Sequence, residues 1–130
     1  MKTGCWRLPP LACMAALILL AVGHASGGEA RTTLIIVEGA AGEPEFSSEL
    51  REQTQAWQRA GAAGAAEVVT IGVAPLSASG DREELRQAIA RHVAGDAELW
   101  LVLIGHGTFD GREAKFNLRG PDVADAELAE

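Results

Sequence analysis

Runs of apolar residues divide the chain beyond its N-terminal segment into three strands separated by two helices. Residues 31–37, 67–72 and 99–104 are largely apolar without strict alternation, which is typical of parallel strands covered on both faces. Residues 44–60 and 81–94 instead repeat apolar residues at helical spacing. We therefore predict an α/β sandwich of three layers with a mainly parallel sheet and right-handed crossovers.

The first predicted helix begins near Pro44, a residue type that suits the first helical turn. Its apolar side carries Phe46, Leu50 and Trp57. We expect Phe46 and Trp57 to lie in the core and not to form a binding surface. The alanine and glycine residues at 61–66 indicate a short connector to the second strand.

The second predicted helix begins at Asp81, with Glu84 three residues later as the partner in a capping box. Its buried face is expected to carry Leu85, Ile89 and Val93. His92 lies next to that face near the helix C-terminus, where an imidazolium interacts favourably with the helix dipole. We therefore interpret His92 as a structural residue.

A hairpin and a final helix are predicted after the third strand. Asp110-Gly111 is a strong turn signal, and residues 108–118 have the pattern of two short strands around it. Gly120-Pro121 ends the hairpin, and Asp122 is positioned to cap a helix over 123–130. That helix stops partway through its apolar pattern, so we expect the sequence to be part of a longer domain.

The first 25 residues have the pattern of a secretory signal peptide. Lys2 and Arg7 precede an apolar run over 11–22, and small residues up to Ala25 mark the expected cleavage site. The run has 12 residues, fewer than the roughly 20 that span a bilayer, so we predict no stable membrane insertion after cleavage. The domain is expected over 26–130, exported to the periplasm or the extracellular space.

Charge and cysteine content narrow the functions open to this domain. Cys5 and Cys13 both lie in the signal segment, so the mature chain has no disulfide and no thiol nucleophile. Cleavage would also remove two basic residues and no acidic one, which moves the formal charge from −7 to −9. An acidic domain without a basic stripe is a poor binder of nucleic acid or of anionic membranes.

One histidine is expected at the ligand-binding edge of the sheet, because the third strand ends on Gly105-His106-Gly107. The carboxyl ends of parallel strands meet at one edge, so Glu38, Gly72 and His106 should lie along it, where ligands of such sheets bind. A histidine can exchange a proton at neutral pH, and the glycine after it leaves a backbone N–H free to approach an oxyanion. His106 is therefore the candidate for proton transfer.

The segments LVLIGHGTFDG and KFNLRGPD resemble the first half of a caspase-like cysteine peptidase domain, from the superfamily of legumain, gingipain and the caspases (clan CD), and the resemblance spans residues 32–128. In that superfamily one apolar strand ends in His-Gly and a second ends in Ala-Cys or a close variant. The resemblance implies a peptidase that acts on peptide or protein substrates. It further implies that His106 protonates the leaving amine and that Gly107 lends its N–H to an oxyanion hole.

The cysteine-bearing part of that motif is absent from the sequence. Caspases carry the cysteine about 50 residues after the histidine, whereas 24 residues follow His106. We therefore expect a fragment of an exported cysteine endopeptidase that is inactive alone and has the C-terminal half of the same domain as its partner. Glu38 and Asp110 are expected near the cleft as substrate-binding residues, where acidic side chains would favour basic substrate side chains.

Two other functions fit parts of this pattern. A serine α/β-hydrolase also has a His-Gly turn after an early strand, but it requires a G-x-S-x-G elbow. That elbow is formed by none of Ser26, Ser47, Ser48, Ser77 and Ser79. A non-catalytic exported module that binds a partner or a peptide through the same edge stays open, because a fold does not determine a function.

Metal and dinucleotide binding fit the sequence less well. His106, Asp110 and Glu113 do not have the spacing of a compact metal-ligand motif. The three glycines between 105 and 111 are spaced G-x-G-x-x-x-G and precede a hairpin, whereas the dinucleotide fingerprint is G-x-G-x-x-G and opens a helix. We predict no metal and no cofactor.

Overall fold

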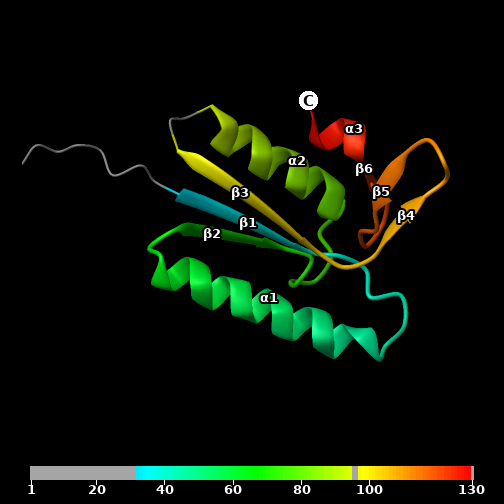
Figure 1. Cartoon of the computed structure of the whole chain (residues 1–130), viewed down its shortest axis with the longest axis horizontal. Helices are drawn as coiled ribbons and strands as arrows, with labels where there is room; N and C mark the ends of the chain where they lie inside the picture. Colours follow the sequence, from blue (N-terminus) through cyan, green and yellow to red (C-terminus); the bar gives the residue numbers. More distant parts are fainter. Residues whose placement is uncertain (1–31, 95–96, 130) are drawn as a thin grey trace, which may run out of the picture.

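The structure is a computed structural model of the chain and describes residues 32–94 and 97–129. Figure 1 shows a parallel sheet between two long helices, with a smaller sheet beside it. The elements in chain order are β1 (Thr32–Glu38), α1 (Phe46–Ala63), β2 (Glu67–Ile71), α2 (Gly80–Val93), β3 (Glu98–Ile104), β4 (Gly107–Phe109), β5 (Ala114–Phe116), β6 (Val123–Ala124) and α3 (Asp125–Leu128). The expected signal peptide over 1–25 lies outside the described residues.

Strand β1 is the centre of a three-stranded parallel sheet with the order β2-β1-β3. In its register, Val37 lies opposite Ile71 of β2 and Leu103 of β3. Helix α1 covers one face of this sheet and α2 covers the other (Figure 1). The three predicted strands and the α/β class are therefore confirmed.

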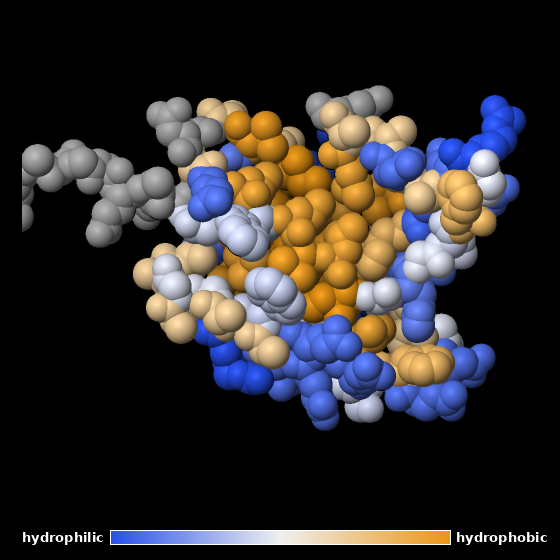
Figure 2. Space-filling model, viewed as in Figure 1, coloured by the Kyte–Doolittle hydropathy of each residue, from blue (hydrophilic) through white to orange (hydrophobic). Residues whose placement is uncertain are grey.

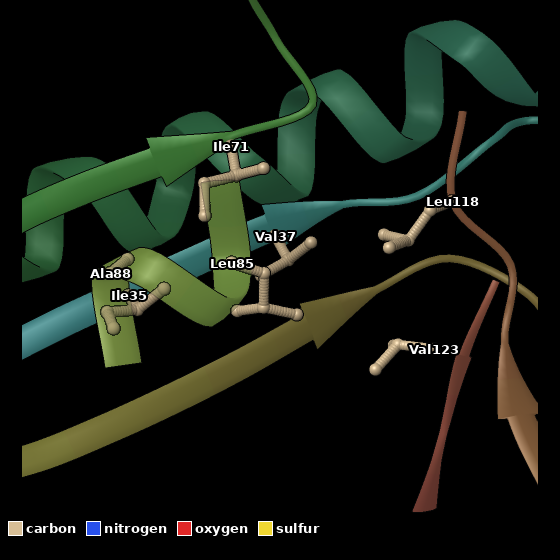
Figure 3. Packing of buried hydrophobic residues seen from close by; sticks show 7 residues of the cluster. All are labelled: Ile35, Val37, Ile71, Leu85, Ala88, Leu118 and Val123. Atoms are coloured by element: carbon tan, nitrogen blue, oxygen red, sulfur yellow. The ribbon is translucent and has the colours of Figure 1, made fainter. Parts of the chain in front are cut away.

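The core lies on both faces of β1. Toward α2, Ile35 and Val37 pack with Leu85 and the residues around it, as Figure 3 shows. Toward α1, Leu34 and Ile36 form a second cluster. Because both faces of β1 are covered, its sequence is continuously apolar and does not alternate.

Helix α1 differs from the prediction at its two aromatic residues. Phe46 and Trp57 are each 39% exposed, so the expectation that they lie in the core is wrong. The buried residues of the helix are Leu50, Thr54 and Gly61. Phe46 is the first residue of α1, at the end that extends past the strands in Figure 1. Trp57 lines a shallow groove beside the edge strand β3. None of the described elements covers the outer side of this groove.

The C-terminal turn of α1 continues into residues 61–63, which were predicted as part of a connector. Gly61 permits this, because a Cβ there would lie 2.6 Å from Cγ2 of Val68 and 2.8 Å from Cδ2 of Leu34. Replacing Gly61 by alanine should lower the free energy of unfolding by about 2 kcal/mol through overpacking, which urea denaturation would measure. Gly64→Ala is the matched control, since its Cβ would meet nothing closer than 3.5 Å. Equal effects of the two substitutions would contradict this explanation.

Helix α2 begins with a buried carboxylate and not with the predicted capping box. The Asp81 side chain is 0% exposed, and its two oxygens accept hydrogen bonds from Nε and Nη2 of Arg119, each at 2.8 Å. The capping box of Asp81 and Glu84 is therefore wrong, because a distant guanidinium binds the Asp81 carboxylate. On the predicted apolar face Leu85 is buried, whereas Val93 is exposed.

The predicted hairpin belongs to a three-stranded antiparallel sheet with the order β4-β5-β6. Strands β4 and β5 flank the turn at residues 110–111, which confirms the hairpin. Strand β6 was not predicted: Val123 is buried and lies opposite Phe116 in β5, where a helix over 123–130 was expected. Helix α3 is one turn long, and Asp122 accepts the N–H of Leu118 at 3.1 Å, so the predicted cap is wrong.

Strand β3 forms an open edge of the parallel sheet within the described residues. Its side chains include Trp100, which is 50% exposed, and Leu103, which is 36% exposed. Figure 2 shows apolar side chains gathered over β3 and α2 on this side of the molecule. None of the helices in residues 32–94 and 97–129 has the length and apolarity that crossing a membrane requires.

Candidate functional site

His106 lies at the carboxyl end of the parallel sheet, two residues after β3. The N–H of Gly39 donates to the carbonyl oxygen of Ile104 at 2.8 Å, so β1 and β3 end together. A Cβ on Gly105 would lie only 3.2 Å from Cα of Gly39. This close approach of two glycines lets the chain turn off the sheet at His106.

The other predicted edge residues lie at the same end of the sheet. Glu38 is the last residue of β1 and pairs with Ile104, and Gly72 directly follows β2. Gly72 and Glu38 touch through their backbones, because a Cβ on Gly72 would lie 1.9 Å from the carbonyl oxygen of Glu38. The parallel register thus brings the ends of all three strands together.

The backbone at His106 is also tied to the smaller sheet through Asn117. The N–H of Asn117 donates to the carbonyl oxygen of His106 at 3.0 Å, and its own carbonyl oxygen accepts the N–H of Ala40 at 2.9 Å. One residue therefore connects the His106 turn, the loop after β1 and the end of β5. Sequence analysis did not identify Asn117, and no signal could have done so, because any residue type except proline offers these two backbone groups.

The imidazole of His106 is exposed and contacts one aromatic ring. The centroids of the His106 and Phe46 rings lie 5.4 Å apart with an interplanar angle of 76°, an edge-to-face arrangement. No side chain in the described part of the chain hydrogen-bonds to this imidazole. The ring is therefore accessible from solvent and packs edge-to-face against Phe46.

The N–H of Gly107 is not used in the ladder between β4 and β5. Gly107 lies opposite Phe116, and the flanking bond runs from the N–H of Asn117 to the carbonyl of His106. In an antiparallel ladder this pattern makes Gly107 and Phe116 a pair that exchanges no hydrogen bonds, so the N–H of Gly107 points away from β5. Because no strand within residues 32–94 and 97–129 pairs with the outer side of β4, this donor is available beside the imidazole.

The carboxylate of Glu38 faces helix α1 and binds a guanidinium. It is 6% exposed and accepts hydrogen bonds from Nε of Arg51 at 3.0 and 3.2 Å and from Nη2 at 2.9 Å. This ion pair fastens the first turns of α1 to the end of β1. A ligand cation could reach the Glu38 carboxylate only by displacing Arg51.

Asp110 lies at the exposed tip of the hairpin. Its Oδ1 accepts the backbone N–H groups of Arg112 and Glu113, each at 2.9 Å. These two bonds hold the pKa of the Asp110 carboxyl below its ordinary value, and the bond from Glu113 has the larger effect. Asp110 is therefore an ionised, solvent-facing carboxylate whose second oxygen is free of these turn bonds.

In the described residues His106 belongs neither to a metal-binding cluster nor to the largest groove described below. The residues that the structure describes contain no group of three or more His, Cys, Asp or Glu side chains able to hold a metal ion. Glu113, one of the weighed ligands, instead pairs with Nζ of Lys115 at 2.9 Å. A groove of about 840 Å³ lies between α2 and α3, lined by apolar residues such as Leu85 and Leu128 and by paired charges. It does not include His106.

The His106 turn can therefore donate or accept a proton and offer one backbone N–H next to it. Neither group is a nucleophile that could attack a carbonyl to form a stable acyl intermediate, and residues 26–130 contain no cysteine. Comparisons of the chain with protein-family models, with curated proteins and with solved structures found no match.

Proposed function

We propose that this chain supplies the histidine side of the active site of an exported, caspase-like cysteine endopeptidase. The observation that carries the proposal is the arrangement at residues 105–107, where an exposed imidazole and an unused backbone N–H stand together at the carboxyl edge of a parallel sheet. The resemblance of LVLIGHGTFDG to the His-Gly strand of that superfamily gives this arrangement its chemical role.

In the proposed reaction a cysteine thiolate attacks the peptide carbonyl carbon, and the carbonyl oxygen becomes an oxyanion. The N–H of Gly107 donates a hydrogen bond to that oxyanion, which stabilises the charge that develops in the transition state. The His106 imidazolium gives its proton to the leaving amine, so that the carbon–nitrogen bond breaks and a thioester remains. Water then attacks the thioester and gives one proton to His106, so that the carboxylic acid leaves and both the thiolate and the imidazolium are regenerated.

The cysteine has to come from polypeptide outside residues 26–130, and the open edge of β3 supports a position for it. A strand added in parallel to this edge would end next to His106, since β3 itself ends two residues before it. It would also cover Trp100 and Leu103, two large apolar side chains that are exposed in β3. The missing half of the same domain is therefore the proposed partner of this surface.

Asp110 is the better supported of the two proposed substrate-binding carboxylates. A basic substrate side chain could contact its exposed second oxygen without breaking an ion pair. Glu38 would first have to lose Arg51, to which it makes three hydrogen-bond contacts. We therefore propose Asp110 as a direct contact and Glu38 as a residue that supports the cleft wall.

The test is a His106→Ala substitution in the complete gene product that includes this chain. We expect kcat/KM for peptide hydrolysis to fall at least about 100-fold, because the leaving amine loses its proton donor. Circular dichroism should be unchanged, because the imidazole is exposed. His92→Ala is the matched control and should keep its activity, since His92 lies on α2, away from the His106 turn.

Unchanged hydrolysis by the His106→Ala variant would refute the assignment of His106 as the catalytic histidine and, with it, the caspase-like mechanism. The continuation of the reading frame provides a second test, because the proposal requires an apolar strand that ends in cysteine. A G-x-S-x-G elbow there would favour a serine hydrolase. Small or polar residues in place of the cysteine would favour a non-catalytic module that binds peptides through this edge.

A further inference from the structure

We propose that Phe46 is a positioning residue that holds the imidazole of His106 in its working orientation. The inference rests on the proposed function, because it assigns to α1 a role in the same site. In catalytic pairs and triads the base is normally oriented by a third group, commonly a carboxylate or an amide. Here the described residues offer His106 an aromatic ring in that place.

The contact itself has the geometry of an attractive aromatic pair. The ring centroids are 5.4 Å apart and the planes are inclined by 76°, which lies within the range of favourable edge-to-face arrangements. Both rings are partly solvent-exposed, Phe46 at 39%. An apolar side chain this exposed contributes little to the core, so its contact with His106 is the distinctive feature of its position.

Phe46 is held firmly enough to act as a support. It is the first residue of α1, and its N–H donates to the carbonyl oxygen of Glu43 at 3.2 Å. One turn later Leu50 is buried against the sheet, and Arg51 is bound to the buried Glu38 at the end of β1. These two anchors fix the first turns of α1 relative to the strand end.

His106 is fixed to the same strand end from the other side. Its backbone is bonded to Asn117, which in turn accepts the N–H of Ala40, two residues after β1. The backbones of both partners are therefore tied to the end of β1, while the side chain of His106 is restrained by the ring of Phe46. Loss of that ring would free the imidazole without moving the turn that carries it.

The first test detects the contact between the Phe46 and His106 rings by NMR in the 130-residue chain. It does not require the chain to hydrolyse any substrate. We expect cross-relaxation between the Phe46 and His106 ring protons. Phe46→Leu should shift the His106 ring resonances and leave the amide resonances of β1 and β3 in place, and Phe46→Tyr should restore the shifts. Trp57→Leu is the matched control, because Trp57 lies on the same helix, is also 39% exposed, and should leave the His106 resonances unchanged.

The second test is kinetic and uses the complete peptidase. Phe46→Leu should lower kcat by about two- to tenfold, the size of one aromatic pair, with KM unchanged, and Phe46→Tyr should recover it. Unaltered His106 resonances in Phe46→Leu, or an unaltered kcat in that variant, would overturn the positioning role. Absence of hydrolysis by the wild-type protein would refute the proposed peptidase function, while the resonances would still decide whether Phe46 holds the imidazole.

Discussion

Replacing Gly72 by alanine is expected to lower the free energy of unfolding by about 4 kcal/mol. Gly72 has a φ of +91°, a conformation that costs an L-residue about 1 to 2 kcal/mol. The added Cβ would also lie 1.9 Å from the carbonyl oxygen of Glu38 and 2.8 Å from its carbonyl carbon. Both atoms belong to the central strand, so relief of the clash requires β1 and the segment after β2 to separate.

Gly111→Ala separates the two contributions to that cost. Gly111 has a φ of +92°, almost equal to that of Gly72, and a Cβ there would meet nothing within 4 Å. Gly111→Ala should therefore lower the free energy of unfolding only by the cost of the backbone conformation, about 1 to 2 kcal/mol. Urea denaturation of both variants measures the difference, and equal losses would show that the approach of Gly72 to Glu38 is not a tight contact.

The parallel sheet can be predicted from the sequence because its central strand is buried on both faces. Such a strand needs apolar side chains at consecutive positions, and Leu34, Ile35 and Ile36 meet that need without any information from the rest of the chain. The hairpin is predictable for a similar reason. Tight hairpin turns favour residue pairs such as Asp-Gly, so two adjacent residues, Asp110 and Gly111, are enough to indicate the turn.

The wrong capping box at Asp81 arises because this residue has a partner that is distant in the sequence. Asp81 is suited to a helix N-terminus, but its actual partner is Arg119 from the segment after β5. Asp122 is a different case, because it binds the N–H of Leu118, only four residues earlier, and not the start of a helix. A local pattern identifies the polar group and its need for a partner, and only the tertiary structure supplies that partner.

The residues of the candidate site also divide into those that the sequence identifies and those that only the tertiary structure identifies. His106 and Gly107 can be identified from the sequence, because their role depends on the strand that immediately precedes them. Phe46 cannot be identified, since helical periodicity assigns it to the core, and its contact with His106 depends on how far α1 extends past the sheet. Asn117 contributes backbone groups that leave no trace in the sequence.

The ion pair of Arg119 and Asp81 gives the second large effect, because it joins the segment between β5 and β6 to the start of α2. Arg119 donates to Asp81 on α2 and, through Nη1, to the carbonyl oxygen of Ala74 after β2 at 2.7 Å. The bond to Asp81 is the main reason that the pKa of the Arg119 guanidinium lies above its ordinary value. The guanidinium therefore stays charged throughout the range in which the protein would be studied.

Arg119→Met should lower the free energy of unfolding by about 3 kcal/mol, because it leaves a fully buried carboxylate without its counter-ion. The position of Asp81 in the first turn of α2 offsets part of the cost, since a helix N-terminus favours a negative charge. Asp81→Asn should cost less, about 1 to 2 kcal/mol, because Arg119 is 30% exposed and can turn toward water. Arg82→Met, which removes the exposed pair with Glu127, is the control and should change stability little.

A double variant distinguishes an ion pair from a loss of packing. Asp81→Leu combined with Arg119→Met removes both charges, so its cost should be smaller than the sum of the costs of Asp81→Leu alone and Arg119→Met alone. Hydrogen exchange should show the amides of β5 opening sooner in Arg119→Met, because the guanidinium is a bridge between that sheet and the start of α2. Additive costs, together with unchanged exchange in β5, would mean that the backbone hydrogen bonds of Asn117 and the buried side chains of Leu118 and Val123 hold the smaller sheet in place without the ion pair.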